Sequence, residues 1–198
     1  MRPHEDSWLV ATSDEMVARH IVRGELGCPV CFARYPVREG VVDFSAGASH
    51  PREYAAHESM ALRVAALLDL VEPGGMVVLA GAWSAAANEL LEMIEGVQLL
   101  ALDYSRELQS GGALSLALIG DVLPLAAASA RGIALDAAHA TPSLLAGAAR
   151  ALAPKGRLIA PAGVPVPAAL QLLARDDEYW VAESVASISA PVAIGMRR

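Results

Sequence analysis

Residues 76–81 have the sequence MVVLAG and residues 97–103 have the sequence VQLLALD, and these two apolar runs decide the predicted fold. Each run has the length of a β-strand, and neither alternates polar with apolar residues, which is typical of strands buried on both faces of a sheet. Between the two runs, apolar residues recur at helical spacing after Ser84, which can cap a helix through about Glu95. A strand, a helix and a strand in this order predict a parallel β-α-β unit.

The same alternation continues on both sides of this unit. Apolar residues at helical spacing predict a helix that begins near Met60 and ends at Glu72-Pro73-Gly74-Gly75. Thr141-Pro142 opens another helix, which closes near Pro154. We expect further strands at 113–121, 131–138 and 156–163, a short helix at 167–175, and two strands in the tail 178–196. Strands alternating with helices predict an α/β fold with a doubly wound parallel sheet and crossovers on both faces.

Length and composition support a folded domain and exclude several classes of protein. The 198 residues are 55% hydrophobic and 19% charged, which is enough to bury one ordinary core with a small appendage. The net charge of −7 argues against broad nucleic-acid binding, which needs a basic face. The longest uncharged stretch, 158–174, contains three prolines and is shorter than the about 20 apolar residues of a membrane helix. The N-terminal MRPHEDSW has no apolar signal-peptide core, so we expect a soluble, cytoplasmic protein.

The composition changes near residue 50, which predicts a division of the chain. Residues 1–47 are mixed and charged, residues 48–75 form a linker and a helix, and residues 76–198 carry the alternating strands and helices. The first segment contains both cysteines, in Cys28-Pro-Val-Cys31. Because nothing indicates secretion, this pair suggests a metal knuckle or a redox pair rather than a structural disulfide.

The stretch GELGCPVCFARYPVREGVVDF, residues 24–44, resembles the second half of the short zinc ribbons that precede many bacterial methyltransferase domains. It is also similar to the zinc-ribbon activator subunits of tRNA and protein methyltransferases. The matching residues are Cys28, Cys31, Tyr35, Pro36, Val37, Gly40, Val41 and Asp43. The resemblance implies a zinc-ribbon-like β-hairpin with Cys28 and Cys31 as metal ligands.

The first half of that ribbon is missing, because residues 7–15, SWLVATSDE, contain no thiol. A structural zinc ion needs four protein ligands. His20 is a candidate third ligand, and a symmetric partner could supply both cysteines again. The alternative is a metal-free hairpin that packs through Phe32, Tyr35 and Val37 and keeps both thiols reduced.

From about Val64 onward, the order of elements resembles that of class I S-adenosylmethionine-dependent methyltransferases. Three segments carry the resemblance: LLALDYS at 99–105, GDVLPL at 120–125 and ARALAPKGRL at 149–158. The resemblance implies a Rossmann-like methyltransferase sheet with S-adenosylmethionine at its carboxyl edge. It implies that Asp103 binds the ribose hydroxyls and that Asp121 and Val122 lie near the adenine. Gly81 would let the backbone approach the methionine half of the cofactor.

The chain departs from that family in the first loop, because VVLAGAWSA keeps only Gly81 of the expected pattern. Leu79 stands at the position of the acid, and Trp83 and Ala85 stand at the positions of two glycines. Trp83 therefore either stacks on a ligand or plugs the cofactor pocket. Asp136 and His139 follow the fourth predicted strand of the sheet and are the acid/base candidates at this edge, or structural residues.

Three functional hypotheses follow. The first is a methyltransferase of unknown acceptor whose degenerate cofactor loop leaves weak or no activity. The second is a catalytically inactive pseudo-methyltransferase that serves as a partner or scaffold subunit, either as a homodimer or bound to a methyltransferase. The third is a protein that binds another small ligand in the same crevice. The first loop lacks the three-glycine fingerprint of dinucleotide binding, which places the third hypothesis last.

Overall fold

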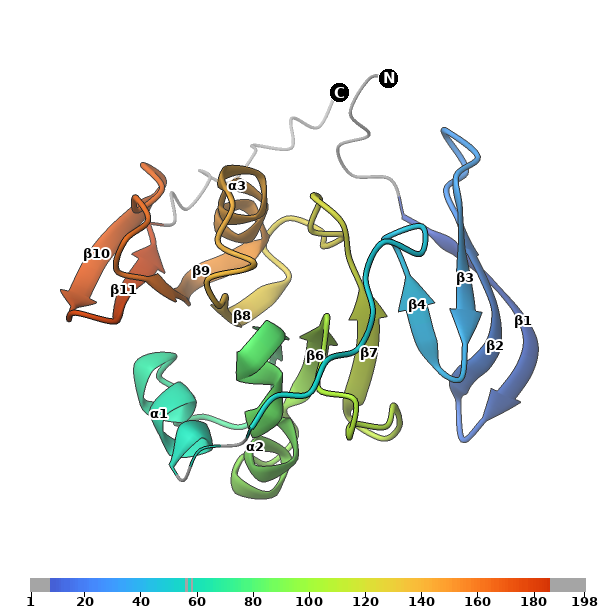
Figure 1. Ribbon diagram of the computed structural model, residues 1–198, viewed down its shortest axis with the longest axis horizontal. Helices are drawn as coiled ribbons and strands as arrows, with labels where there is room; N and C mark the ends of the chain where they lie inside the picture. The colour runs from blue at the N-terminus through green and yellow to red at the C-terminus, as the bar shows by residue number, and fades with distance from the viewer. Residues whose placement is uncertain (1–7, 56, 58, 186–198) are drawn as a thin grey trace, which may run out of the picture.

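The computed structural model describes residues 8–55, 57 and 59–185, which build an eleven-stranded mixed sheet with helices on both faces (Figure 1). The spatial order of the strands is β1-β2-β3-β4-β7-β6-β5-β8-β9-β11-β10. In chain order the elements are β1 (Val10–Val17), β2 (His20–Gly27), β3 (Arg34–Arg38), β4 (Val41–Asp43), α1 (Met60–Leu67), β5 (Met76–Ala80), the 3-10 helix η1 (Gly81–Ala86), α2 (Ala87–Met93), β6 (Gln98–Leu102), β7 (Leu114–Leu118), β8 (Ala130–Ala134), α3 (Pro142–Ala151), β9 (Leu152–Pro161), β10 (Leu170–Arg175) and β11 (Tyr179–Ser184).

The central strands β7, β6, β5, β8 and β9 pair in parallel, as the sequence predicts. Residues 77–80 of β5 are fully buried, which explains why that run is apolar without alternation. The chain order reverses between β5 and β8, because β6 and β7 lie on one side of β5 and β8 and β9 on the other. Such a reversal opens a crevice at the carboxyl ends of the two strands, where α/β proteins bind ligands.

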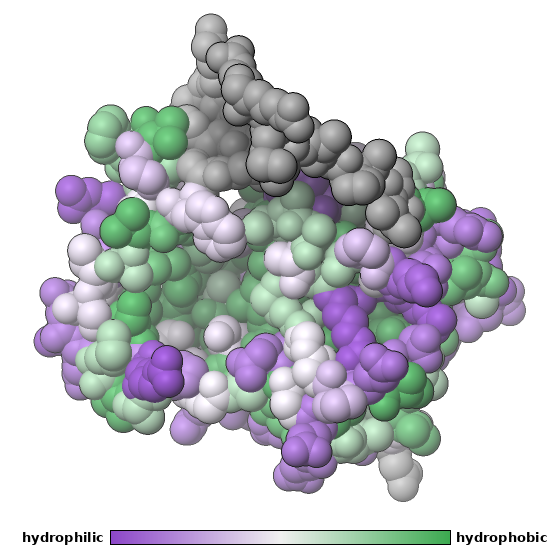
Figure 2. Space-filling view, turned by 180° about the vertical axis from the view of Figure 1, so that it is seen from behind, coloured by the Kyte–Doolittle hydropathy of each residue, from purple (hydrophilic) through white to green (hydrophobic). Residues whose placement is uncertain are grey.

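Separate apolar clusters cover the two faces of the sheet, whereas the molecular surface seen in Figure 2 mixes hydrophobic with hydrophilic residues. Val64 of α1 and Leu90 of α2 pack on one face, and Leu144 and Ala148 of α3 pack on the other. Figure 1 shows α3 on the opposite side of the strands from α1 and α2. Thr141 caps α3, since its side chain accepts a hydrogen bond from the backbone N–H of Leu144 at 3.3 Å. No helix in the described chain is long and apolar enough to cross a membrane.

The prediction of a short helix at 167–175 is wrong, because Leu170–Arg175 form strand β10. β10 pairs antiparallel with β11, which in turn pairs antiparallel with β9. The side chain of Asp176 accepts backbone N–H bonds from Glu178 and Tyr179 and thereby closes the turn between the two strands. Pairing with β11 therefore outweighs the helical preference of the Ala- and Leu-rich sequence. The second strand predicted in the tail lies outside the described residues.

The N-terminal segment continues the main sheet. β1, β2, β3 and β4 form an antiparallel meander, and β4 joins β7 in parallel with Val42 opposite Ala117. The hairpin predicted within residues 24–44 is confirmed as the antiparallel pair β3 and β4. Its packing differs from the expectation at one position, because Phe32 is 79% exposed. Tyr35 packs against Phe44 with ring centroids 4.8 Å apart.

The structure does not support the zinc ribbon. Cys28 and Cys31 lie in and beside the turn between β2 and β3. Within the described residues, no group of three or more His, Cys, Asp and Glu side chains is arranged to hold a metal ion. The prediction of His20 as a third zinc ligand is wrong, because His20 begins β2 and the length of that strand separates it from Cys28. An extended strand of that length spans roughly 26 Å.

Candidate functional site at the switch point

Three titratable side chains meet in the crevice between β5 and β8. Asp103 directly follows β6, and Asp136 and His139 follow β8, so the topology brings all three to the carboxyl edge of the sheet. His139 lies between the two carboxylates. Its Nδ1 is 2.6 Å from Asp136 Oδ1, and its Nε2 is 2.9 Å from Asp103 Oδ2. We call these three residues the crevice triad.

Backbone and hydroxyl donors hold the Asp103 carboxylate. Its Oδ1 accepts hydrogen bonds from the Ser49 hydroxyl at 2.6 Å and from the Ile119 backbone N–H at 3.0 Å. With His139 on Oδ2, three of the about four acceptor positions of the carboxylate are engaged. The residue is only 8% exposed. Most of the Asp103 carboxylate is therefore held by the protein's own donors.

The Asp136 carboxylate connects the triad to the first loop, the loop that follows β5, through a hydrogen bond. Its Oδ2 accepts the backbone N–H of Ala82 at 2.9 Å, and its Oδ1 accepts the backbone N–H groups of Ala138 and His139, each at 3.1 Å. Gly81 has a positive φ of 60°, and a Cβ at this position would lie 2.0 Å from Asp136 Oδ2. Only glycine fits here, because it tolerates this backbone conformation and leaves room for the carboxylate.

The triad carries a buried positive charge between two negative ones. Burial lowers the pKa of His139, but hydrogen bonds and charge attraction from Asp103 and Asp136 outweigh burial and raise the pKa to about 9. Burial raises the pKa of each carboxyl group, but the hydrogen bonds from His139 and from nearby donors lower both pKa values below the usual range. At neutral pH the triad is thus an imidazolium between two carboxylates.

A segment between β4 and α1, residues 44–55, runs over the crevice, and we call it the crossing segment. Figure 1 shows it in cyan, passing in front of β7 and β6 on its way to α1. Its Ser49 holds Asp103, and its Arg52 forms a parallel bridge with Ser105. The backbone N–H of Arg52 donates to the carbonyl of Tyr104 at 3.1 Å. The crossing segment therefore covers the carboxyl ends of β6 and β7.

The prediction that Ser84 caps a helix is wrong, because Ser84 lies inside the 3-10 helix η1. Its buried hydroxyl donates to the Gly81 carbonyl at 2.6 Å and accepts the Ser105 backbone N–H at 2.8 Å. These two bonds join the loop after β5 to the loop after β6. The first loop is consequently fixed on two sides, by Ser105 through Ser84 and by Asp136 through Ala82.

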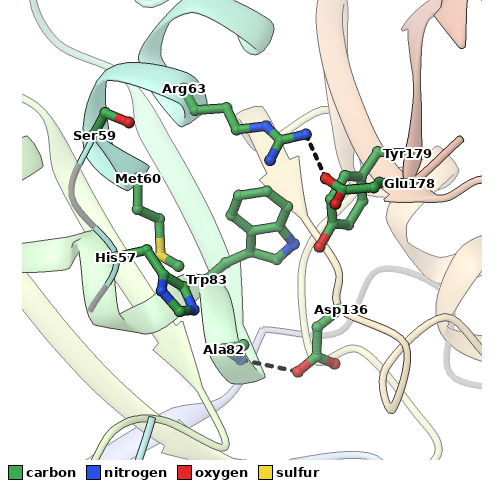
Figure 3. Close-up of a pocket in the computed structure, with 9 residues that line it drawn as sticks. All are labelled: His57, Ser59, Met60, Arg63, Ala82, Trp83, Asp136, Glu178 and Tyr179. Carbon is green, nitrogen blue, oxygen red and sulfur yellow. Dashed lines mark hydrogen bonds and ion pairs between the residues drawn. The ribbon is translucent and has the colours of Figure 1, made fainter. Parts of the chain in front are cut away.

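Two small cavities flank the crevice triad. The first, of about 270 Å³, lies beside η1 and includes Trp83 and Asp136 among its lining residues (Figure 3). The second, of about 220 Å³, includes Ser49, Asp103 and Asp121. Both are smaller than the roughly 300–1,000 Å³ that is usual for pockets of drug-sized ligands.

The residues predicted to bind the cofactor lie around the crevice triad and its two cavities, with one exception. Gly81 lies against the Asp136 carboxylate, and Trp83 lines the first cavity. Asp103 and Asp121 line the second cavity. The side chain of Asp121 is exposed. Val122 lines neither cavity and is 71% exposed.

These positions do not fit S-adenosylmethionine. A ribose would need two acceptor positions on Asp103, whereas three of about four are already engaged. The space beside Gly81 holds the Asp136 carboxylate, and the indole of Trp83 stands where the resemblance expects a glycine. In this arrangement the protein's own side chains occupy the crevice.

No family model matches the chain, and no curated protein matches it in sequence. Solved structures do show similarity. Phosphoethanolamine N-methyltransferase 2 from Haemonchus contortus, in complex with S-adenosyl-L-methionine, is 14% identical, with a TM-score of 0.44 over 54% of this chain and 28% of that one. A chain from the complex of the Haloferax volcanii methyltransferase activator Trm112 with a methyltransferase is 23% identical, with a TM-score of 0.38, covering 54% and 61%. The antibiotic-resistance methyltransferase Kmr is 14% identical, with a TM-score of 0.44, covering 69% and 98%.

The similarity is one of fold, and the chain spans about a quarter of the length of the first of these structures. The strand order and the parallel register of β7, β6, β5, β8 and β9 define the fold independently of it. The chain is an α/β protein with a parallel core of five strands and additional antiparallel strands at its N-terminus.

The sequence singles out all three residues of the triad, but for separate roles: Asp103 for ribose, and Asp136 and His139 as acid/base candidates or structural residues. Their contact with one another and with their other partners was not predicted. Ser49 lies in a stretch without periodicity, so nothing in the sequence indicates that it reaches Asp103. The Ala82 and Ile119 donors are backbone groups, which leave no mark on residue type. The three-residue spacing from Asp136 to His139 is the one available signal, since it allows the two side chains to meet after a strand.

Proposed function

We propose that this chain is a pseudo-methyltransferase: it keeps the methyltransferase-like sheet, fills the cofactor crevice with its own side chains, and acts as a partner or scaffold subunit. One observation carries the proposal. The His139 imidazolium occupies the crevice and contacts both Asp103 and Asp136. The alternative, an active methyltransferase of unknown acceptor, would require S-adenosylmethionine to displace this buried ion cluster.

That displacement would cost more than an ordinary conformational adjustment. Asp103 would have to give up His139 and the Ser49 hydroxyl, and His139 would be left beside Asp136 alone. Breaking a buried ion pair by removing one partner costs about 3–5 kcal/mol. That energy lowers the affinity of any ligand that needs Asp103 by roughly a hundredfold or more.

The test is a calorimetric titration of the full chain with S-adenosylhomocysteine and S-adenosylmethionine, cross-checked by thermal shift. A ligand at a hundred times its dissociation constant stabilises a fold by about 2.7 kcal/mol, so binding in the crevice would be readily detected. We expect no stabilisation. Micromolar binding that is lost in Asp103→Ala but kept in Glu92→Ala, an exposed carboxylate of α2, would refute the proposal.

The subunit role is supported by exposed apolar side chains on the N-terminal strands. Every residue of β1 is exposed, and Val10, Met16 and Val17 are each 57% exposed. β1 is also the edge strand of the described sheet, and an edge strand can pair with a second chain through its outer backbone groups. We propose a homodimer through this edge, and light scattering should then give twice the chain mass. Met16→Lys should restore a monomer, whereas a monomeric wild type at high concentration would exclude the homodimer.

A further inference from the structure

Trp83 holds a buried hydrogen-bond donor that nothing in the described part of the chain accepts. The residue is 3% exposed, and its indole Nε1 has no partner there. Buried indole N–H groups usually find an acceptor. Trp180, which is fully buried on the other face of the sheet, shows this ordinary case, because its Nε1 donates to the Val164 carbonyl at 2.9 Å. The difference points to a missing acceptor beside Trp83.

The first cavity lies beside this indole, and both of the carboxylates that line it are already engaged. Figure 3 shows Trp83 at the centre of the lining residues, with Arg63 above it, Tyr179 and Glu178 to one side and Asp136 below. Asp136 is occupied by Ala82 and His139, as described above. Glu178 is held by the Arg63 guanidinium at 2.9 Å. The lining therefore combines an unused N–H donor with a cation.

A partly exposed ion pair and an aromatic ring line the cavity beside the indole. The Arg63 guanidinium lies 5.1 Å from the Tyr179 ring centroid, and the Tyr179 and Trp83 rings are 5.0 Å apart. The side chains of Arg63 and Glu178 are 43% and 65% exposed. Exposed ion pairs contribute little to stability, so a carboxylate from outside can replace Glu178 on Arg63 at small cost.

We propose that this cavity binds a small organic carboxylate. The ligand's carboxylate takes the place of Glu178 on Arg63 and accepts the Trp83 N–H, while its apolar part packs against Met60 and the indole. The volume of about 270 Å³ limits the ligand to a molecule smaller than the usual drug-sized ligand. The cavity shares Asp136 with the crevice triad, but the proposed ligand contacts neither Asp103 nor His139, so the site can be tested separately from the proposed function.

The test follows the indole N–H resonances of the 15N-labelled full chain by NMR during titration with sodium benzoate and sodium acetate. Trp83→Phe assigns the Trp83 resonance. We expect benzoate to move it downfield in a saturable way, because the N–H gains an acceptor, and to leave the Trp180 resonance in place. Benzamide, which has the same shape without the charge, should produce no such shift.

Matched variants separate the proposed site from non-specific anion binding. Arg63→Gln should weaken benzoate binding roughly tenfold or more, since it removes a charge-assisted bond. Glu178→Gln should strengthen it, because the nearer of the two carboxylates that pair with Arg63 is gone. Arg34→Gln should leave it unchanged, because Arg34 forms a similar exposed pair with Glu25 on the N-terminal strands.

Several outcomes would overturn the proposal. These are a Trp83 resonance that neither carboxylate moves, an equal response to benzamide, and an affinity that Arg63→Gln does not change. A shift caused by inorganic phosphate but not by benzoate would also overturn it, in favour of a phosphate site. Benzoate binding without binding of S-adenosylhomocysteine would support both proposals, whereas S-adenosylhomocysteine binding that needs Asp103 would overturn only the proposed function.

Discussion

Raising the pH should lower the free energy of unfolding of this protein, because His139 loses its proton. The pKa of His139 is about 9 in the folded chain and 6.5 as an ordinary value, because two carboxylates hold the imidazolium despite its burial. A pKa that is higher in the folded state contributes stability that is complete below pH 6.5 and is lost as the pH rises through about 9. A gap of this size corresponds to roughly 3 kcal/mol of the free energy of unfolding.

His139→Asn isolates this contribution. At about pH 6 the variant leaves Asp103 and Asp136 without the cation between them, which should cost about 3–5 kcal/mol. Near pH 9.5 the wild-type imidazole is itself mostly neutral, so the difference between the two proteins should shrink by roughly 3 kcal/mol. Urea unfolding followed by circular dichroism at both pH values measures the two differences directly. His50→Asn, at an exposed position in the crossing segment, is the matched control and should show no such change.

A difference between wild type and His139→Asn that stays constant from about pH 6 to 9.5 would refute the assigned charge state. Because the variant is strongly destabilised, a second measurement on the wild type stands beside it. NMR titration of the His139 ring reports its pKa without any substitution. A value at or below 6.5 would show that the two carboxylates do not hold an imidazolium.

Three further substitutions test individual contacts by chemical unfolding. Gly81→Ala should destabilise the chain by at least about 1–3 kcal/mol, because φ is 60° and the new Cβ would meet Asp136; a neutral effect would contradict the close approach. Ser49→Ala should cost about 1–2 kcal/mol by removing the 2.6 Å bond to Asp103, whereas Ser129→Ala, an exposed control, should cost little. Trp180→Phe should cost about 2–4 kcal/mol, because the fully buried indole loses both volume and its bond to a backbone carbonyl; a loss below about 1 kcal/mol would contradict this packing.

The central sheet was predictable from sequence because burial on both faces leaves a strong signal. The runs at 76–81 and 97–103 contain no charge until the Asp103 that ends the second strand, and both form parallel strands at the expected places. The α3 helix was predictable because Thr141-Pro142 is a local start signal that tertiary contacts do not override. The sequence signals for these elements lie within a few neighbouring residues.

The remainder depends on contacts between distant parts of the chain. β10 has helical composition, and its conformation is set by pairing with β11 rather than by its own residues. The CxxC motif predicts a metal site only if further ligands converge on it, and the extended strand β2 carries His20 away from it. The crossing segment is irregular, so the contact of Ser49 with a residue 54 positions later leaves no periodic pattern.

The crevice triad also explains how the first loop is held in place. Leu79 stands where the family resemblance expects an acid, and here it is fully buried in the apolar cluster that contains Trp83 and Val64. The backbone N–H of Ala82 still needs an acceptor, and Asp136 supplies one from the next strand along the sheet. That arrangement gathers two carboxylates in one buried place, which is unfavourable unless a cation joins them. His139 is that cation, so the crevice triad pairs these buried polar groups with one another.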